Sequence, residues 1–158
     1  MRLGILGTLS LALMLISQVA LAETVRIGFV TTLTGGAGAI GNDMRDAVEL
    51  ALDHLGRKMG DSDVKMFYED DTFKPAVGKQ KTEKLVKKDK VHFVTGYIWS
   101  HVLMASRNSA VGKGPFMITS NAGPGAVAGK LCHEDFFSTS WQNDQTTMAM
   151  GEVLNQLG

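Results

Sequence analysis

The sequence predicts an α/β fold in which a parallel sheet carries helices on both faces. Two observations lead to this prediction. Short runs rich in β-branched and aromatic residues alternate with segments whose apolar residues recur at helical spacing, which is typical of βαβ units. The first run, Val25–Thr31, is also apolar on both alternating sets, as expected of a strand that is buried on both faces of its sheet.

The other elements follow in order along the chain. After a Gly-rich loop, apolar and small residues in 44–55 predict an amphipathic helix that Asn42 or Asp43 could cap. Residues 64–68 predict the second strand, and Pro75 is well placed to open a helix that runs to Lys88. We further expect strands at 91–97, 116–119 and 136–139, a helix at 102–111, and a last helix marked by Met148, Val153, Leu154 and Leu157.

Four loops are predicted to carry any binding site. In open parallel sheets, ligands bind beyond the carboxyl ends of the strands. The loops at this edge are residues 32–43, 69–74, 97–101 and 120–129.

The amino-terminal residues predict export. An uncharged and mostly apolar run at 3–16 follows Arg2 and precedes the small-residue pattern Ala20-Leu21-Ala22. The run is shorter than the roughly 20 residues that a helix needs to cross a bilayer. We therefore expect residues 1–22 to be a signal peptide cut after Ala22, and the mature product to be a soluble, exported protein that does not itself span the membrane.

Composition narrows the range of partners. Without residues 1–22 the chain has 15 basic and 16 acidic residues and a formal charge of −1, so nothing points to a nucleic-acid partner. Cys132 is the only cysteine, which excludes an internal disulfide and a four-cysteine metal site. We expect its side chain to be buried as a small apolar group. The lysine-rich segment 74–90 predicts a solvated helix face.

The stretch GAGAIG at residues 36–41 has the spacing of a dinucleotide-binding fingerprint. Three observations argue against that function. Residues 32–35 separate the stretch from the end of the first strand, and the helical pattern begins only after Gly41. The acidic residues of the second strand end, Glu69 to Asp71, also come 28 to 30 residues after Gly41, where the motif expects about 20. We expect no cofactor, and glycines that bend the backbone close to a small molecule or turn the chain.

The sequence predicts no catalytic residue and no metal site. Ser100 lacks the flanking glycines of a nucleophile elbow, and the adjacent His101 is poorly placed to act as its base. The four histidines show no HExxH spacing. Ser100 is instead placed to cap the helix that follows, alone or together with anion binding at the helix N–H groups. Tyr97, Trp99 and Trp141 could form aromatic walls of a small-molecule site or pack at strand ends.

The mature chain resembles the amino-terminal lobe of type I periplasmic solute-binding proteins, in the leucine/isoleucine/valine-binding group that serves ABC importers. The resemblance covers nearly all of residues 24–158 and is carried by VRIGFVTTLTGGAGAIGNDMRDAVELALDHLG, YEDDTFKPAVGKQKTEKLVKKDKVHFVTGYIWS, GPFMITSNAG and FFSTSWQNDQTTMAMGEVLNQLG. It implies a periplasmic-binding-protein-like I fold. It also implies a receptor, monomeric at full length, whose two lobes close on a small organic acid or amino acid and which then docks on an inner-membrane ABC permease.

The resemblance also implies a set of ligand-binding residues. The family's carboxylate-binding loop matches Trp99, Ser100 and His101, and its second binding loop matches Asn121, Ala122 and Gly123. We add Tyr97, Trp141 and Gln142 at the neighbouring strand ends. Amino-acid binders carry a Thr where this chain has Gly123, so the resemblance favours an aromatic acid over a branched-chain amino acid.

Family members are more than twice as long as this chain, and Trp141-Gln142-Asn143-Asp144 resembles their first crossover between lobes. We therefore expect residues 23–141 to form the amino-terminal lobe, and residues 142–158 to form the crossover and the first helix of a second lobe that is otherwise missing. On such a truncated chain Leu154 and Leu157 should be exposed and should favour association. Two alternatives stay open, which are an exported enzyme that uses the Gly-rich loop or Ser100, and a sensory ligand-binding domain.

Overall fold

The computed structural model describes residues 23–158, so the predicted signal peptide lies outside the described residues. A six-stranded sheet has the order β2-β3-β1-β4-β5-β6. Every neighbouring pair is parallel except β2 and β3, which form an antiparallel hairpin. The strands are β1 Val25–Thr31, β2 Lys58–Met59, β3 Ser62–Asp70, β4 Phe93–Gly96, β5 Phe116–Thr119 and β6 Phe136–Ser138.

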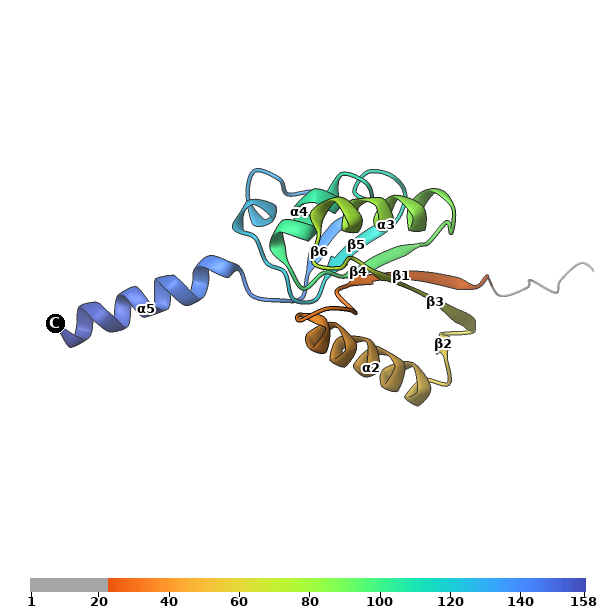
Figure 1. Cartoon of the computed structure of the whole chain (residues 1–158), viewed down its shortest axis with the longest axis horizontal. Coiled ribbons are helices and arrows are strands. Elements are labelled where there is room, and N and C mark those ends of the chain that lie inside the picture. The colour runs from red at the N-terminus through yellow and green to blue at the C-terminus, as the bar shows by residue number, and fades with distance from the viewer. Residues whose placement is uncertain (1–22) are drawn as a thin grey trace, which may run out of the picture.

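Helices cover both faces of the sheet, as Figure 1 shows. Helix α2 (Gly38–His54) lies on one face, while α3 (Pro75–Lys87) and α4 (Ser100–Arg107) lie on the other. A 3-10 turn, η2 (Gly125–Ala128), precedes β6, and α5 (Asn143–Leu157) ends the chain. This architecture confirms the predicted α/β fold. No helix within residues 23–158 has the length and apolar character needed to cross a membrane.

Helix α2 begins at Gly38, well before the predicted start. Its first turn has Ile40 as its only large apolar residue, beside Gly38, Ala39 and Gly41, so the sequence displays no apolar periodicity there. Gly41 is buried in this turn, and a Cβ there would overlap the backbone carbonyl of Thr32. Asn42 is not a cap, because it lies inside the helix and its Nδ2 donates to the carbonyl oxygens of Leu33 (3.0 Å) and Gly38 (2.8 Å). The expected cap was therefore wrong.

Other boundaries differ by smaller amounts. Strand β3 extends beyond residues 64–68 at both ends. Its first residues pair with β2, a strand that the sequence did not predict. Helix α4 starts two residues early and stops at Arg107, whose guanidinium donates to the carbonyl oxygen of Leu131 (2.5 Å). Cys132 follows in the turn region after η2 and is exposed, which contradicts the expectation that it would be buried.

The main core lies between the sheet and the face formed by α3 and α4. Its buried residues are Val30, Leu85, Val91, Val94, Tyr97, Val102, Leu103, Ala110, Val111, Met117 and Ala122. Because β4 and β5 supply the centre of this core, the turns that leave their carboxyl ends are held in place by packed side chains.

The strand order places the topological switch point of the sheet between β1 and β4, where open α/β sheets have a crevice. From β1 the chain moves to β3 on one side and then crosses to β4 on the other. The point at which the direction of winding reverses is where doubly wound sheets bind ligands. The loop after β1 and the turn after β4 therefore meet at the carboxyl edge of the sheet.

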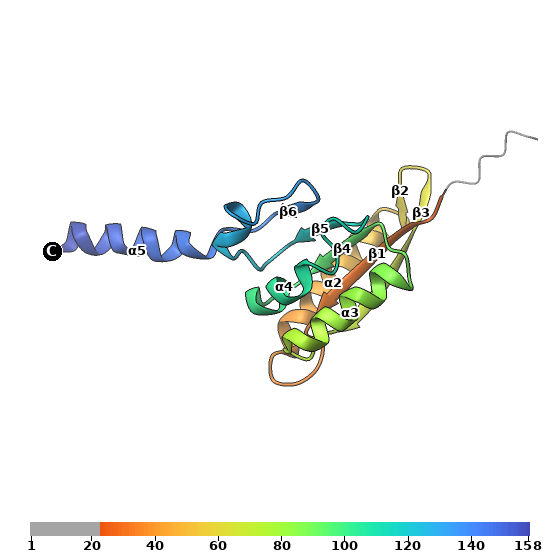
Figure 2. The same cartoon turned by 90° about the horizontal axis from the view of Figure 1, so that it is seen from above.

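Helix α5 projects away from the rest of the chain in both views of the molecule (Figures 1 and 2). None of its residues is buried, and Leu157 is 78% exposed. Leu154 is exposed as well, so the predicted exposure of both leucines is confirmed.

Candidate functional site

A chain of two hydrogen bonds ties together the loops that follow β1, β3 and β4. The indole Nε1 of Trp99 donates to Oγ1 of Thr32 (3.0 Å). The Thr32 hydroxyl donates in turn to Oδ1 of Asp71 (2.5 Å). Thr32 and Asp71 are completely buried. The Thr32 hydroxyl and the Asp71 carboxylate thus join these loops at a point that water does not reach.

The turn after β3 has an unusual backbone. Thr72 and Phe73 adopt positive φ angles of 50° and 64°, a region that side-chain-bearing residues rarely occupy. Each is stabilised by a preceding aspartate, since Oδ1 of Asp70 accepts the Thr72 N–H (2.8 Å) and Oδ1 of Asp71 accepts the Phe73 N–H (2.8 Å). Such Asx turns compensate for the steric cost of the left-handed conformation.

This turn directs Phe73 towards two other rings. The Phe73 ring meets Trp99 edge to face, with centroids 4.7 Å apart, and meets His101 in the same way at 5.0 Å. We call Phe73, Trp99 and His101 the aromatic cluster. Phe73 is 47% exposed and His101 is exposed. The cluster therefore presents ring surface to solvent at the carboxyl edge of the sheet.

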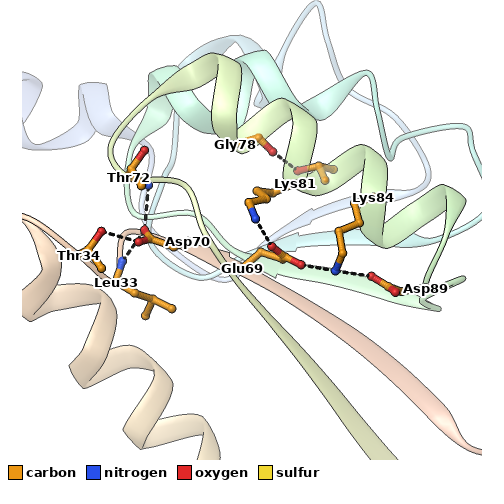
Figure 3. A network of polar contacts seen from close by, with 10 residues as sticks. Leu33, Thr34, Glu69, Asp70, Thr72, Gly78, Lys81, Lys84 and Asp89 are labelled. Carbon is orange, nitrogen blue, oxygen red and sulfur yellow. Dashed lines mark hydrogen bonds and ion pairs between the residues drawn. The ribbon is translucent and has the colours of Figure 1, made fainter.

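Asp70 anchors the loop after β1. Its carboxylate accepts from the backbone N–H of Leu33 (2.9 Å) and from the hydroxyl of Thr34 (2.5 Å), in addition to the N–H of Thr72. Figure 3 shows these three donors around the carboxylate. Burial disfavours the charged form of Asp70, but these hydrogen bonds outweigh it and hold its pKa below the usual value.

Glu69, the residue before Asp70, is also held by polar contacts, in this case from lysines (Figure 3). Its side chain is 9% exposed and pairs with Nζ of Lys81 (2.8 Å) and with Nζ of Lys84, which also pairs with Asp89 (3.0 Å). Burial raises the pKa of Glu69, but the hydrogen bonds from the two lysines lower it by more, so the pKa lies below its usual value. Two residues of the predicted solvated lysine face thus neutralise a buried carboxylate.

Helix α4 begins at the aromatic cluster. Trp99 has the extended conformation of an N-cap residue (φ −104°, ψ 126°), and Ser100 is already helical, so the predicted capping by the Ser100 side chain is wrong. The Ser100 hydroxyl instead accepts from Nδ2 of Asn143 (2.9 Å). The N–H of Leu103 bonds to the carbonyl of Trp99 (2.9 Å). The amides of residues 100–102 precede this first bond of the helix and form its positive end, which favours an anion.

The loop after β5 is held by hydrogen bonds to carbonyl oxygens of the turn after β4. Nδ2 of Asn121 donates to the carbonyl of Ile98 (2.8 Å), and the N–H of Ala122 donates to the carbonyl of Tyr97 (3.1 Å). These bonds fix Asn121, Ala122 and Gly123 beside the turn after β4. The donor of Asn121 is therefore already used within the protein.

Three other predicted residues lie close together, which are Gly123, Trp141 and Gln142. They line a hollow of about 300 Å³ together with Pro124, Phe136 and Gln145. The N–H of Asn143 donates to the carbonyl of Gly123 (2.7 Å), and its side chain reaches Ser100. Asn143 thus links this second group of predicted residues to the start of α4.

Tyr97 belongs neither to the aromatic cluster nor to the group that contains Gly123. Its side chain is completely buried and shares a hydrogen bond of 2.6 Å with the hydroxyl of Thr82 on α3. Burial raises the pKa of the Tyr97 hydroxyl far above its usual value. Of the two predicted roles for this ring, the geometry matches packing at the strand end.

The Gly-rich loop differs from a dinucleotide site despite one shared feature. Gly41 does lie inside α2 and packs against the strand end, so the argument that the helix begins after it was wrong. The other two observations against a dinucleotide site still hold, which are the separation from β1 and the spacing to the acidic residues. Residues 32–35 lie between β1 and GAGAIG. Asp70 and Asp71, the candidate ribose ligands, already accept hydrogen bonds from Leu33, Thr34 and Thr32.

Sequence reasoning had singled out the loops that these contacts bring together, but not Thr32, Asp71 and Phe73 within them. The acidic turn at the end of β3 was the available signal. An aromatic residue two positions after Asp71, at a carboxyl strand end, would have pointed to Phe73.

Comparison with known proteins places this geometry in context. The family model for periplasmic binding proteins matches residues 24–158. An ABC transporter substrate-binding protein from Sphaerobacter thermophilus is 31% identical over 78% of this chain and 34% of its own, with a TM-score of 0.73. An ABC transporter solute-binding protein from R. palustris, solved with benzoate, is 26% identical over 85% of this chain and 38% of its own, with a TM-score of 0.79.

A branched-chain amino acid binding protein from Streptococcus pneumoniae, solved with isoleucine, shares the fold at 22% identity and a TM-score of 0.69, over 75% of this chain and 34% of its own. The search of curated proteins returned no match. The chain spans about a third of the length of the solved structures that it matches.

Proposed function

Because this chain belongs to the periplasmic binding protein family, we propose that it serves as the extracytoplasmic solute-binding component of an ABC transporter and acts without chemistry. Its solute is a small carboxylate, an aromatic acid in preference to a branched-chain amino acid. The similarity to substrate-binding proteins of ABC transporters supports the role, and the benzoate bound to the relative from R. palustris supports the choice of solute.

One observation carries the proposal, which is that the amino terminus of α4 opens beside exposed aromatic rings. A carboxylate at this position would accept from the amides of residues 100–102 and from the hydroxyl of Ser100. The organic part of the solute would then lie against Trp99, with His101 and Phe73 next to it. A site that pairs an anion-binding helix end with an apolar wall suits an aromatic carboxylate.

The second group of residues would complete this wall. Asn121, Ala122 and Gly123 lie beside the turn after β4, and Trp141 and Gln142 follow through Asn143. We propose that residues 23–141 act as one lobe and that residues 142–158 lead into a second, which closes over the solute. The closed form would dock on a permease in the inner membrane. The proposed location is the periplasm, reached through a signal peptide at residues 1–22.

A thermal-shift titration with separate arms for benzoate, 4-hydroxybenzoate, isoleucine and NAD tests the proposal. A ligand that binds only the folded protein stabilises it by about 2.7 kcal/mol at a hundredfold excess over its Kd. We expect a rise in Tm with the benzoates and a smaller rise with isoleucine. A larger rise with isoleucine would overturn the choice of solute. A rise with NAD alone would favour a dinucleotide site, and no rise with any of the four would contradict the proposed function.

A pair of variants localises the binding. Ser100→Ala removes the hydroxyl at the proposed carboxylate position, whereas Ser109→Ala removes one beyond the other end of α4. We expect Ser100→Ala to weaken benzoate binding about tenfold to a hundredfold, as loss of one hydrogen bond to a charged group would. Ser109→Ala should leave the affinity within twofold. Equal effects of the two variants would place the solute elsewhere.

A further inference from the structure

The hydroxyl of Thr32 has a fixed hydrogen-bond direction. It contacts Trp99 Nε1, which can only donate, and a carboxylate oxygen of Asp71, which accepts. The single proton of Thr32 therefore points to Asp71, and a lone pair of its oxygen is left for the indole. Since Thr32 and Asp71 are fully buried, water does not compete for the bond between them, and the Thr32 oxygen offers the indole an acceptor with a fixed direction.

The same carboxylate oxygen also sets the position of Phe73. Oδ1 of Asp71 accepts the N–H of Phe73 (2.8 Å), which holds that residue in its left-handed conformation. The two rings then meet at an interplanar angle of 86°. One buried atom thus determines both the indole plane of Trp99 and the place of the ring that packs on it.

We propose that Asp71 and Thr32 are positioning residues that prepare Trp99 and Phe73 as a rigid wall for the planar ring of an aromatic carboxylate. The proposal rests on the proposed function and adds to it a basis for selectivity. A wall that is ordered before binding avoids the entropy loss of fixing two side chains when the ligand arrives. Flat rings pack on such a surface more favourably than puckered rings of the same size.

The test compares Thr32→Val, which removes the hydroxyl but keeps the shape, with Thr32→Ser, which keeps the hydroxyl. Thr95→Val is the matched control, because Thr95 lies in β4 beside the Ile118 of β5 and away from the crevice. Two measurements are made on the full chain. One is the ¹⁵N–¹H signal of the Trp99 indole, assigned by its loss in Trp99→Phe, and the other is the affinity for benzoate and for cyclohexanecarboxylate.

The expected result is specific to the missing hydroxyl. In Thr32→Val the indole signal should shift and exchange faster with water, and the preference for benzoate over cyclohexanecarboxylate should fall about tenfold. Thr32→Ser should retain the wild-type signal and preference, and Thr95→Val should change neither. The proposal is overturned if Thr32→Val lowers only the Tm, or if Thr32→Ser behaves like Thr32→Val.

Failure of the proposed function would look different. If the wild-type chain binds neither carboxylate, the role in ligand selection falls together with that function. The positioning of the ring is then decided by the indole signal alone. An unchanged signal in Thr32→Val would overturn that part as well.

Discussion

The carbonyl oxygen of Trp141 occupies the space in which a side chain on Gly123 would begin. Gly123 is buried, and its own carbonyl accepts the N–H of Asn143 (2.7 Å), so two backbone segments 18 residues apart are in direct contact. The sequence resemblance had suggested that Gly123 marks a ligand without an amino group. The structure adds a second reason for this glycine, which is that no larger residue fits beneath the backbone of Trp141.

Gly123→Ala should therefore destabilise the protein. The added methyl group forces the backbone of Trp141 and Gln142 to move, and overpacking of this kind costs about 1–3 kcal/mol. Chemical denaturation measures the loss. Gly36→Ala is the control, because a Cβ at Gly36 meets no atom within 4 Å, and equal losses for the two variants would contradict the explanation.

Stability should depend on acid through Glu69. Its pKa in the folded protein is below the usual value of 4.5, so its contribution is fully present above that value and is lost as the pH falls through the folded pKa. Glu69→Gln should lower the free energy of unfolding by about 1–2 kcal/mol near pH 7 and flatten the decline below pH 4.5. Urea unfolding between pH 7 and pH 3 gives both quantities.

The control for Glu69 is Glu134→Gln, since Glu134 is exposed in the turn before β6. This variant should follow the wild-type pH profile. A Glu69→Gln profile that is parallel to the wild type at every pH would mean that the lysines contribute nothing through this carboxylate.

Thr82→Val should separate stability from binding. It removes the hydroxyl that bonds to the buried Tyr97, and we expect a loss of about 1–3 kcal/mol in unfolding free energy. Benzoate affinity, measured by calorimetry well below the lowered Tm, should remain within twofold. A tenfold loss of affinity would show that Tyr97 acts at the binding edge after all.

Exposed apolar residues on α5 should promote self-association. Met148, Leu154 and Leu157 are each at least 60% exposed, and an apolar patch of this kind favours contact between molecules. The double variant Leu154→Lys and Leu157→Lys should shift the sedimentation distribution towards monomer. A matched double change on the polar face, Asn155→Lys and Gln156→Lys, should leave the association of the wild type unchanged, and a similar shift there would assign the effect to charge alone.

The sequence predicted the elements whose signals are local. Strands β1 and β5 are apolar runs with the predicted bounds, and Pro75 marks the start of α3 correctly. The first turn of α2 could not be predicted, because Ile40 is its only large apolar residue and its glycine and alanine residues carry no periodic pattern. It is held by close contact between Gly41 and Thr32, which is a tertiary effect.

The candidate site also contains parts that local sequence signals predict and parts that depend on tertiary contacts. The loops followed from the strand ends, since parallel strands place their carboxyl ends on one edge. Phe73 escaped prediction because its position depends on a left-handed turn that Asp71 stabilises. The prediction that Ser100 caps α4 failed for a similar reason, because the backbone angles of Trp99 decide where the helix begins.

The central position of β1 has a consequence for how the protein folds. This strand is made first, yet Ile27 pairs with Phe93 of β4, far along the chain. Long loops must close before such a pair forms, which slows the search for the native sheet. During that interval an apolar strand with open hydrogen-bonding groups on one side remains available to other chains. In pulse-labelling during refolding, the β1 amides that bond to β4 should gain protection late, together with those of β4 itself.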